Sequence, residues 1–302
     1  MQTEEREARE ILARIPSLAC YDGPLQRLGG LTNMVYRAGD AVLRLPGIGT
    51  AEYIDRANEA VAARQAATAG VSPEVLYADA ANGVLATRFI AAAVTMSPTA
   101  FRERSGSPSR AAAAFRRLHQ SGAKFPARFE LFAMIDDYLT LLSNKDVTLP
   151  AGYHDVVAEA GAVRAALGKS EITPVACHCD PLCENFLDTG ERMWIVDWEY
   201  SGMNDPMWDL GDLSVEAGFN AAQDEEMLSS YFSGEAPPED RARMAIHKAM
   251  CDLLWTLWGL IQLANDNPAD DFRVYAETRF ARCKALMASA EFAAHLKMLV
   301  SR

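Results

Sequence analysis

The pattern of apolar and polar residues in the first ninety positions predicts a small sheet with one helix. Apolar and polar residues alternate on both sides of Gly39-Asp40, and again around Asn82-Gly83, which is typical of hairpins with short turns. Residues 50–69, between the hairpins, have helical spacing and are followed by Gly70, a common helix stop. The predicted buried face of this helix consists of Tyr53, Ala57, Ala60 and Val61. The expected order is strand, strand, helix, strand, strand.

The composition changes beyond Ile90. Residues 91–110 are rich in Ala, Ser and Pro and are expected to form a linker or mobile loop. The helices predicted after this stretch cover residues 110–120, 129–142 and 153–167. Two short apolar strands, VACHC and MWIVDW, interrupt the helical region and are joined by a loop.

The length and composition indicate a folded protein with a substantial core, because half of the 302 residues are apolar. We expect an α+β protein with a β-rich lobe over residues 1–90 and a larger, mainly helical lobe over residues 91–302. The most apolar run, Leu253–Ala264, is shorter than the ~20 residues that a membrane span needs. The charged N-terminus is unlike a secretory signal and the six cysteines fit a reducing compartment, so a cytoplasmic location is expected.

The charge of the chain favours small-molecule partners. A formal net charge of -12 argues against nucleic acid and against an anionic membrane surface, while a homodimer is left open. Residues 174–216 contain ten carboxylates, with Arg192 as their only basic residue. Carboxylates at this density repel one another by about 1 kcal/mol per close pair in water. We therefore expect this segment to bind something cationic.

A catalytic motif lies in the same segment. His178, Asp180 and Asn185 form H-x-D-x-x-x-x-N at the end of a strand, and Asp197 follows a second apolar strand twelve residues after Asn185. Phosphoryl transfer needs a carboxylate that takes the proton of the attacking hydroxyl, and an Asn and an Asp that hold Mg²⁺ against nucleotide phosphates. Asp180 is the candidate for the first role, and Asn185 and Asp197 are the candidate metal ligands.

These loops resemble those of the protein-kinase-like fold, in the form found in aminoglycoside phosphotransferases and choline kinases. The string HCDPLCENFL followed by IVDWEYSGMNDPMWDLGD is most similar to the bacterial choline/ethanolamine kinase branch. Cys179 is a departure, because the family commonly has Asn or Arg there. The resemblance implies a bilobal fold with a nucleotide-binding N-terminal lobe, and ATP and Mg²⁺ as cofactors.

The resemblance also assigns residues of the N-terminal lobe to ATP. In the family a hairpin loop covers the phosphates, and a cation on the third strand pairs with an acidic residue on the next helix. The connection between the lobes meets the adenine. These parts correspond here to Gly30, Thr32 and Asn33, to Arg44 with Glu59, and to Phe89. Arg44 replaces the lysine of protein kinases, as choline kinases also tend to do.

An aromatic site for the acceptor is the last expectation. Trp255 and Trp258 are three residues apart on a predicted helix and hence on one face, and Tyr200 follows Asp197. Aromatic faces attract an N-methylated cation. In the choline kinases that this sequence resembles, the corresponding aromatic residues and an acidic residue matching Glu216 line the choline site. Alternatively, the two tryptophans belong to the core of an apolar helix.

The function expected from the sequence is phosphorylation of the hydroxyl of choline or a close amino alcohol by ATP. Phosphotransferases for ethanolamine, thiamine or an aminoglycoside remain alternatives, as does a non-catalytic choline-binding regulator on a kinase scaffold. His178 is expected to pack rather than to transfer protons, and a zinc site with its neighbouring cysteines is disfavoured. Asp205, Asp209 and Asp212 fit solvated charges or helix caps, although Asp212 is a candidate for holding the catalytic loop.

Overall fold

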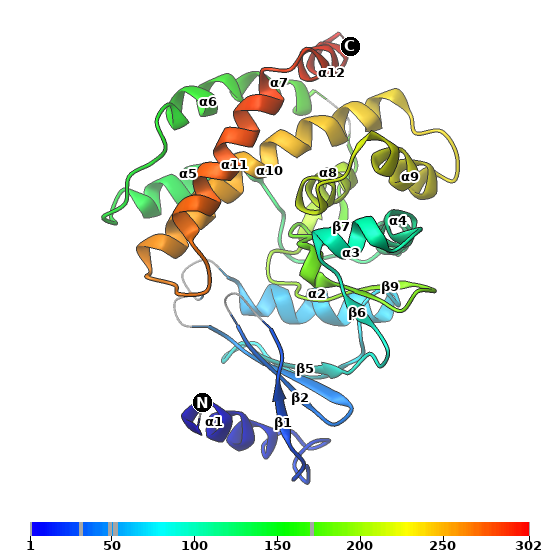
Figure 1. Cartoon of the computed structure of the whole chain (residues 1–302), viewed down its shortest axis with the longest axis vertical. Coiled ribbons are helices and arrows are strands. Elements are labelled where there is room, and N and C mark those ends of the chain that lie inside the picture. Colours follow the sequence, from blue (N-terminus) through cyan, green and yellow to red (C-terminus); the bar gives the residue numbers. More distant parts are fainter. Residues whose placement is uncertain (1, 30–32, 48–49, 51–53, 170–171, 302) are drawn as a thin grey trace.

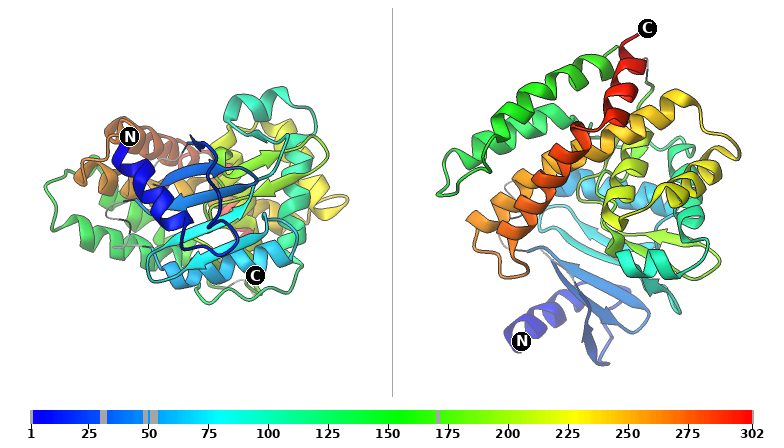
Figure 2. Two further views of the ribbon diagram at one scale, coloured as in Figure 1. Left: turned by 90° about the horizontal axis from the view of Figure 1, so that it is seen from below. Right: turned by 45° about the horizontal axis from the view of Figure 1, so that its top comes forward.

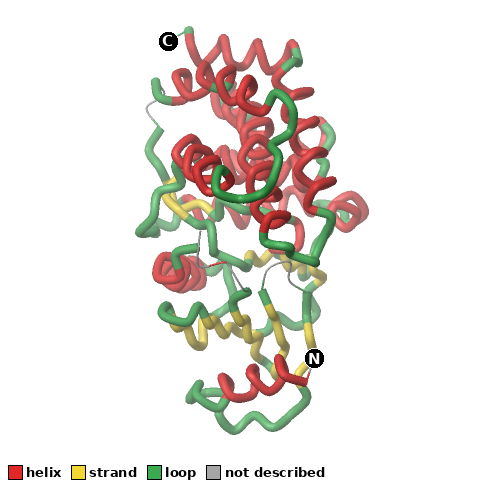
Figure 3. Tube along the Cα trace, turned by 90° about the vertical axis from the view of Figure 1, so that its left-hand side faces the viewer, coloured by secondary structure: helices red, strands yellow, loops and turns green. Residues whose placement is uncertain are grey.

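The molecule has a sheet-built lobe at one end and a helical lobe at the other (Figure 1). The structure, a computed structural model, describes residues 2–29, 33–47, 50, 54–169 and 172–301. Most of the helices gather in the C-terminal lobe, while the larger sheet lies in the N-terminal lobe (Figure 3). The predicted division of an α+β chain into a β-rich part followed by a mainly helical part is confirmed.

The N-terminal lobe is built on a five-stranded antiparallel sheet of order β1-β2-β3-β5-β4. Its strands are β1 (Leu25–Arg27), β2 (Met34–Ala38), β3 (Ala41–Leu45), β4 (Val75–Asp79) and β5 (Val84–Arg88). Both predicted hairpins are confirmed, and Gly39 and Gly83 in their turns have left-handed φ values of 62° and 66°. Helix α1 (Gln2–Leu12) packs Ala8 and Leu12 against this sheet. Figure 2 shows the helix beside the sheet from below.

The helix between the hairpins, α2 (Arg56–Thr68), is shorter than predicted and buries a different face. Asp55 caps its N-terminus by accepting hydrogen bonds from two backbone N–H groups, and Gly70 follows its end with φ 72°. Ala57 and Val61 are exposed, and Tyr53 lies outside the described residues. The residues that are buried are Asn58, Glu59, Ala62, Ala63 and Ala66.

Polar partners explain why the prediction of this face was wrong. Asn58 donates to the carbonyl of Ser201 at 2.7 Å and accepts from the N–H of Ala127 at 3.0 Å, which joins the helix to the C-terminal lobe. An alanine-rich helix has little apolar contrast between its faces. The two buried polar side chains, Asn58 and Glu59, therefore determine its orientation through their hydrogen-bond partners.

Residues 91–110 form structure rather than the expected linker. Strand β6 (Val94–Thr95) pairs with a strand of the C-terminal lobe, and helix α3 (Pro98–Glu103) follows it. Ser97 caps this helix, Pro98 occupies its first position, and Phe101 is buried. A composition rich in Ser and Pro therefore indicates a helix start here, because both residues are favoured at that position.

The strands of the C-terminal lobe form two small sheets. The two predicted strands are present as β7 (Val175–Cys177) and β9 (Met193–Ile195), but they do not pair with each other. β7 pairs with β10 (Gly202–Asn204), whereas β9 pairs with β8 (Phe186–Asp188), which lies between β9 and β6. The expected loop thus contains a third strand, preceded by a short 3₁₀ turn at Cys183–Asn185.

The helical lobe surrounds a 27-residue helix, α10 (Pro238–Ala264), which contributes much of the main core. The predicted helix over residues 153–167 is divided into two at Ala160. The remaining helices are α4 (Ser107–His119), α5 (Leu131–Leu142), α6 (Tyr153–Glu159), α7 (Gly161–Leu167), α8 (Pro206–Ala217), α9 (Ala221–Phe232), α11 (Phe272–Met287) and α12 (Ala290–Val300). Of the helices in the described residues, none combines the length and apolar character that crossing a membrane requires.

A buried ion-pair cluster fastens helices α3 and α4 to strand β8. Asp188 is fully buried and accepts hydrogen bonds from Arg104 at 2.7 Å and from Arg110 at 2.7 and 2.8 Å. Burial alone raises the pKa of Asp188, but the bonds from Arg110 and Arg104 outweigh burial and hold this pKa at about 2. The ionised carboxylate therefore stabilises the fold.

We predict that Asp188→Asn lowers the free energy of unfolding by about 2 to 4 kcal/mol at pH 7, because it leaves two arginines without their anion. An unfolded aspartate has a pKa of about 3.9, so the stabilisation is present above about pH 4 and is lost as the pH falls toward 2. Denaturant unfolding of both proteins at pH 7 and pH 3 measures this difference.

The matched control is Glu74→Gln, which removes the exposed pair of Glu74 with Arg88 and is expected to cost less than about 1 kcal/mol. Equal stability of Asp188→Asn and wild type at pH 7, or a difference that does not shrink at pH 3, would contradict this account.

Candidate active site

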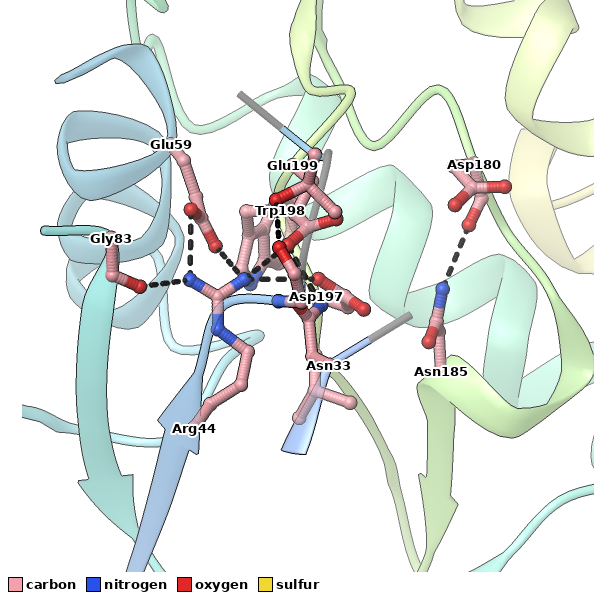
Figure 4. Close-up of polar contacts among 12 residues, drawn as sticks. Asn33, Arg44, Glu59, Gly83, Asp180, Asn185, Asp197, Trp198 and Glu199 are labelled. Atoms are coloured by element: carbon pink, nitrogen blue, oxygen red, sulfur yellow. Dashed lines mark hydrogen bonds and ion pairs between the residues drawn. The ribbon is translucent and has the colours of Figure 1, made fainter. Parts of the chain in front are cut away.

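Arg44 lies at the centre of a buried cluster of charges that spans both lobes (Figure 4). Its Nη2 donates to Glu59 Oε2 at 2.9 Å and to the carbonyl of Gly83 at 2.9 Å. Its Nη1 donates to Glu199 Oε1, which belongs to the C-terminal lobe. The predicted pairing of Arg44 with Glu59 is confirmed. Burial by itself lowers the pKa of the guanidinium, but Glu59 and Glu199 outweigh burial and raise this pKa, so Arg44 is permanently charged.

Glu199 is a residue of this cluster that the sequence reasoning missed. It also accepts hydrogen bonds from Asn33 Nδ2 at 2.8 Å and from Arg56 Nη1. Asn33, one of the predicted phosphate-loop residues, is buried and additionally accepts from the N–H of Gly47 at 3.1 Å. The signal in the sequence was a second carboxylate two residues after Asp197, on the same loop.

Asp197 has unusual backbone and electrostatic surroundings. Its φ of 66° is in the left-handed region, which costs energy for a residue other than glycine. Its Oδ1 is buried, has no hydrogen-bond donor among the described residues, and lies 3.7 Å from Arg44 Nη1. Burial, and after it the charge of Glu199, raise the pKa of Asp197. A carboxylate oxygen without a donor fits a site for a hard divalent cation.

Asp180 and Asn185 lie together in the catalytic loop, as predicted. Asn185 Nδ2 donates to the backbone carbonyl of Asp180 at 3.0 Å, which leaves the amide oxygen Oδ1 for another partner. Burial, and then the nearby charges of Glu216 and Glu199, raise the pKa of Asp180 to about 8. With the oxygen atoms of Asp197, the amide oxygen of Asn185 provides the ligand type that Mg²⁺ prefers.

His178 packs inside the loop. Its Nε2 is 2.9 Å from the carbonyl of Val196, and its Nδ1 is 3.3 Å from the N–H of Asp180. These partners require a neutral ring that donates from Nε2 and accepts at Nδ1, and burial lowers the pKa of His178 accordingly. The histidine thereby ties the loop of Asp180 to the strand end that carries Asp197.

Asp209, rather than Asp212, holds the catalytic loop through hydrogen bonds to its backbone. Asp209 accepts the N–H of His178 on Oδ2 and that of Cys179 on Oδ1, both at 2.8 Å. Asp205 caps helix α8 as expected, since its Oδ1 accepts from the N–H of Met207 at 2.9 Å. Asp209 and Asp212 are fully buried, so the expectation of solvated charges was wrong for both. Asp209 and Asp212 are three residues apart on α8, and Asp209 is the one that bonds the backbone of the loop.

The predicted aromatic residues form two groups rather than one cage. The rings of Tyr200 and Trp255 meet edge to face with centroids 5.2 Å apart. The ring contacts of Trp258 are with Phe272 and Tyr275, with centroids 5.6 Å apart in each case. Trp255 and Trp258 are 3% and 8% exposed and both belong to the main core, which agrees with the alternative of a packing role for each.

The carboxylates behind these rings outnumber the arginines. Trp255 donates its indole N–H to Asp212 Oδ2 at 3.2 Å, while Asp212 Oδ1 is buried without a hydrogen-bond donor among the described residues. Burial, and then the charges of Glu216 and Asp180, raise the pKa of Asp212. Glu216 pairs with the buried Arg279, a residue that sequence reasoning did not single out.

The other predicted nucleotide residues are Gly30, Thr32 and Phe89. Gly30 and Thr32 lie outside the described residues. Phe89 follows β5, its N–H donates to the carbonyl of Asp40 at 2.8 Å, and the guanidinium of Arg37 lies 3.8 Å from the centroid of its ring. Its place at the connection between the lobes agrees with the prediction, whereas contact with adenine stays a prediction.

Known proteins share this architecture. Residues 25–247 match the phosphotransferase enzyme family, APH. The crystal structure of a choline/ethanolamine kinase family protein from Mesorhizobium loti is 70% identical, with a TM-score of 0.91 over 99% of each chain. Protein LicA of Haemophilus influenzae is 29% identical over 266 residues, which are 85% of this chain and 77% of that protein. A crystal structure of LicA in complex with AMP is 25% identical, with a TM-score of 0.76 over 95% of this chain and 98% of that chain.

These matches confirm the predicted protein-kinase-like fold with its sheet-built and helical lobes. In the structure, the charged pair Arg44–Glu59 of the N-terminal lobe meets the carboxylate of Glu199 from the C-terminal lobe (Figure 4). The protein is a phosphotransferase whose acceptor is an alcohol group. The match over most of the chain, together with the 70% identical structure, shows that it belongs to the phosphotransferase enzyme family and, within it, to the choline/ethanolamine kinase family.

Proposed function

We propose that the protein transfers the γ-phosphoryl group of ATP to the hydroxyl of choline or a close amino alcohol. The observation that carries this proposal is the excess of carboxyl groups over arginines beside the catalytic aspartate. Among the described residues, Asp180 and Asp212 have no partner of opposite charge in a direct ion pair, while Arg279 pairs with Glu216 and Asp252, and Arg282 with Asp252. A cationic acceptor would stabilise the ionised form of these carboxylates and bring its hydroxyl to Asp180.

The phosphates of ATP belong between the two lobes in this proposal. Arg44 supplies a positive charge there, and Glu59 and Glu199 hold its guanidinium in place. Asn185 and Asp197 would hold Mg²⁺, which neutralises phosphate charge when bound. Oδ1 of Asp197 has no hydrogen-bond donor among the described residues, which supports the assignment of Asp197 as a metal ligand. Asn33 fixes the end of the phosphate-covering loop through its bond to Glu199.

Asp180 takes the proton of the acceptor hydroxyl as the oxygen attacks the phosphorus atom. Burial and neighbouring carboxylates increase the proton affinity of Asp180, which suits a group that must accept a proton from an alcohol. Asn185 fixes the carbonyl of Asp180, and His178 accepts its N–H, so both bonds set the position of the carboxylate.

The acceptor cation would lie against the faces of Tyr200 and Trp255, close to Asp212 and Glu216. Aromatic faces favour a quaternary ammonium such as that of choline, with each contact worth about 0.5 to 2 kcal/mol. Trp258 supports this region from the core side through Phe272 and Tyr275. The free oxygen of Asp212 favours ethanolamine as the second candidate, because a primary ammonium can donate an N–H to it.

The first test is catalytic and uses an acceptor panel. Wild type is expected to consume Mg²⁺-ATP with choline or ethanolamine and not with thiamine or aminoglycosides. Asp180→Asn is expected to lower kcat by about three orders of magnitude and to leave nucleotide affinity nearly unchanged, because the carboxylate acts on the acceptor hydroxyl. A coupled assay of ADP release measures the rate, and calorimetry measures the affinity.

Glu184→Gln is the control for this test, because it changes an exposed carboxylate on the same loop and is expected to keep kcat. Full turnover of Asp180→Asn would remove Asp180 from the mechanism. A folded wild type that consumes ATP only with thiamine or an aminoglycoside would overturn the proposed acceptor.

The second test separates the two tryptophans. Trp255→Leu removes a π-surface next to Tyr200, so kcat/KM for choline is expected to fall by about ten- to thirty-fold, and that for ethanolamine by less. Trp258→Leu removes core contacts with Phe272 and Tyr275 instead. It is expected to lower Tm by several degrees and to affect both acceptors in equal proportion.

Acceptor kinetics and thermal melting of both variants, measured side by side, decide between these roles. Equal proportional losses for choline and ethanolamine in Trp255→Leu would refute its assignment to the cation. A choline-selective loss in Trp258→Leu would return that residue to the acceptor site.

A further inference from the structure

A surface groove lies between the end of α2, the start of β4 and strand β9. Its volume is about 490 Å³, within the range of small-molecule sites, which is roughly 300 to 1,000 Å³. Arg64 and Gly70 line it from the N-terminal lobe, and Trp194 lines it from the C-terminal lobe. The lining residues differ from those assigned above to the nucleotide, the metal and the acceptor.

The groove is situated where the two lobes are joined by hydrogen bonds. Gly70 and Ser72, which both line it, belong to the turn after α2. The carbonyl of Gly70 accepts a hydrogen bond from Arg192 Nη2, and Ser72 Oγ accepts one from Trp198 Nε1 at 3.0 Å. A ligand in the groove would therefore contact both lobes at once.

Three arginines lie around this groove without carboxylate partners. Arg64 lines it, Arg192 binds the carbonyl of Gly70, and a Cβ atom at position 70 would lie 3.7 Å from Arg117 Nη1. Within the described part of the chain, none of the three arginines forms an ion pair. Burial, and then the charge of Arg117, lower the pKa of Arg192. The guanidinium groups thus repel one another, and an anion between them would relieve this repulsion.

The groove also offers apolar surface to an organic group. Trp194 and Val75 line it and are half-buried. The guanidinium of Arg192 lies 3.8 Å from the centroid of the Trp194 ring, so the two side chains hold each other in place. Glu74, an acidic residue of the lining, pairs with Arg88 at 2.9 Å, which compensates its charge.

Stabilisation of the C-terminus of α2 is the rival explanation for the arginines, because cations are favoured at that end of a helix. The carbonyls of Ala66 and Ala67 already accept backbone N–H groups from the turn that follows. The helix end therefore does not require Arg64 or Arg117. A purely structural role would also not need the half-buried apolar wall beside them.

We propose that this groove is a second binding site, which takes a phosphate monoester. The phosphate would lie among Arg64, Arg117 and Arg192, because guanidinium groups donate strong charge-assisted hydrogen bonds to a dianion. The organic part would pack on Trp194 and Val75. A phosphotransferase that acts on an alcohol releases a phosphate monoester, so the site would recognise the product class of the reaction. This inference goes beyond the proposed function and does not rest on the identity of the acceptor.

Calorimetry with glycerol 3-phosphate tests this proposal, with the nucleotide site filled by a non-hydrolysable MgATP analogue. This probe carries no cationic group, so the carboxylates of the acceptor site disfavour its binding there. We expect wild type to bind about one equivalent, and to bind inorganic phosphate about three- to tenfold more weakly because phosphate lacks the organic part.

The double variant Arg64→Gln/Arg117→Gln removes two of the three cations. Both side chains are exposed, so the fold is expected to be retained, and affinity for glycerol 3-phosphate is expected to fall by about tenfold or more. The matched control, Arg102→Gln/Arg116→Gln, removes the same amount of charge. Arg102 donates to Thr99 and Arg116 to Ser233, and neither lines the groove, so affinity is expected to stay within about twofold of wild type.

Each outcome bears on the proposal. A folded wild type that does not bind glycerol 3-phosphate would overturn the site. Equal losses in the two double variants would overturn it as well, because they would indicate an effect of net charge alone. Equal affinity for inorganic phosphate and for the ester would overturn the assignment to an ester. If thermal melting shows that Arg64→Gln/Arg117→Gln does not fold, Arg117→Gln alone, with an expected loss of about threefold or more, decides the question.

Failure of this inference and failure of the proposed function are distinguishable. A wild type that binds glycerol 3-phosphate in the groove but uses neither choline nor ethanolamine would overturn the proposed acceptor and leave the site standing. A wild type that phosphorylates choline without binding the probe would do the reverse.

Discussion

The Arg44 guanidinium binds carboxylates from both lobes at once, and the geometry of the cleft depends on this arrangement. Glu59 arrives on helix α2 of the N-terminal lobe, while Glu199 comes from the loop of the C-terminal lobe that also carries Asp197. Arg56 and Asn33 bind the same carboxylate. Because a buried charge without a partner is costly, these contacts determine how the lobes meet, and they place the cation of Arg44 next to the proposed metal ligand.

The same balance of charge explains the acceptor side of the cleft. Arg44, Arg56 and Arg279 pair with carboxylates, and neighbouring carboxylates raise the pKa values of Asp180 and Asp212, so a bound cation would favour ionisation of these two groups. A site of this kind binds a cation well and an anion poorly, which fits a cationic alcohol that approaches MgATP. Asp209 holds the catalytic loop, since its carboxylate accepts the backbone N–H groups of His178 and Cys179 directly before Asp180.

Features encoded within a short segment could be predicted from the sequence. Both hairpins turn through glycines with left-handed backbones, and the H-x-D-x-x-x-x-N loop brings Asp180 and Asn185 together over five residues. Features that depend on distant partners could not. Contacts of Asn58 with the C-terminal lobe determine which face of α2 is buried. The direction of α8 determines that Asp209 is the aspartate that bonds the catalytic loop. Glu199 was overlooked because its three partners are 143 to 166 residues away in the chain.

The central claim is that Arg44 and Glu199 act as one unit in forming the nucleotide site. A double-mutant cycle of Arg44→Met and Glu199→Gln, measured by calorimetry as the affinity for MgATP, tests this claim most directly. We predict a coupling energy of about 1 kcal/mol or more. Loss of Arg44 leaves the carboxylate of Glu199 uncompensated, and the repulsion that this carboxylate then exerts is removed in Glu199→Gln. Effects that add within about 0.3 to 0.5 kcal/mol would contradict the account.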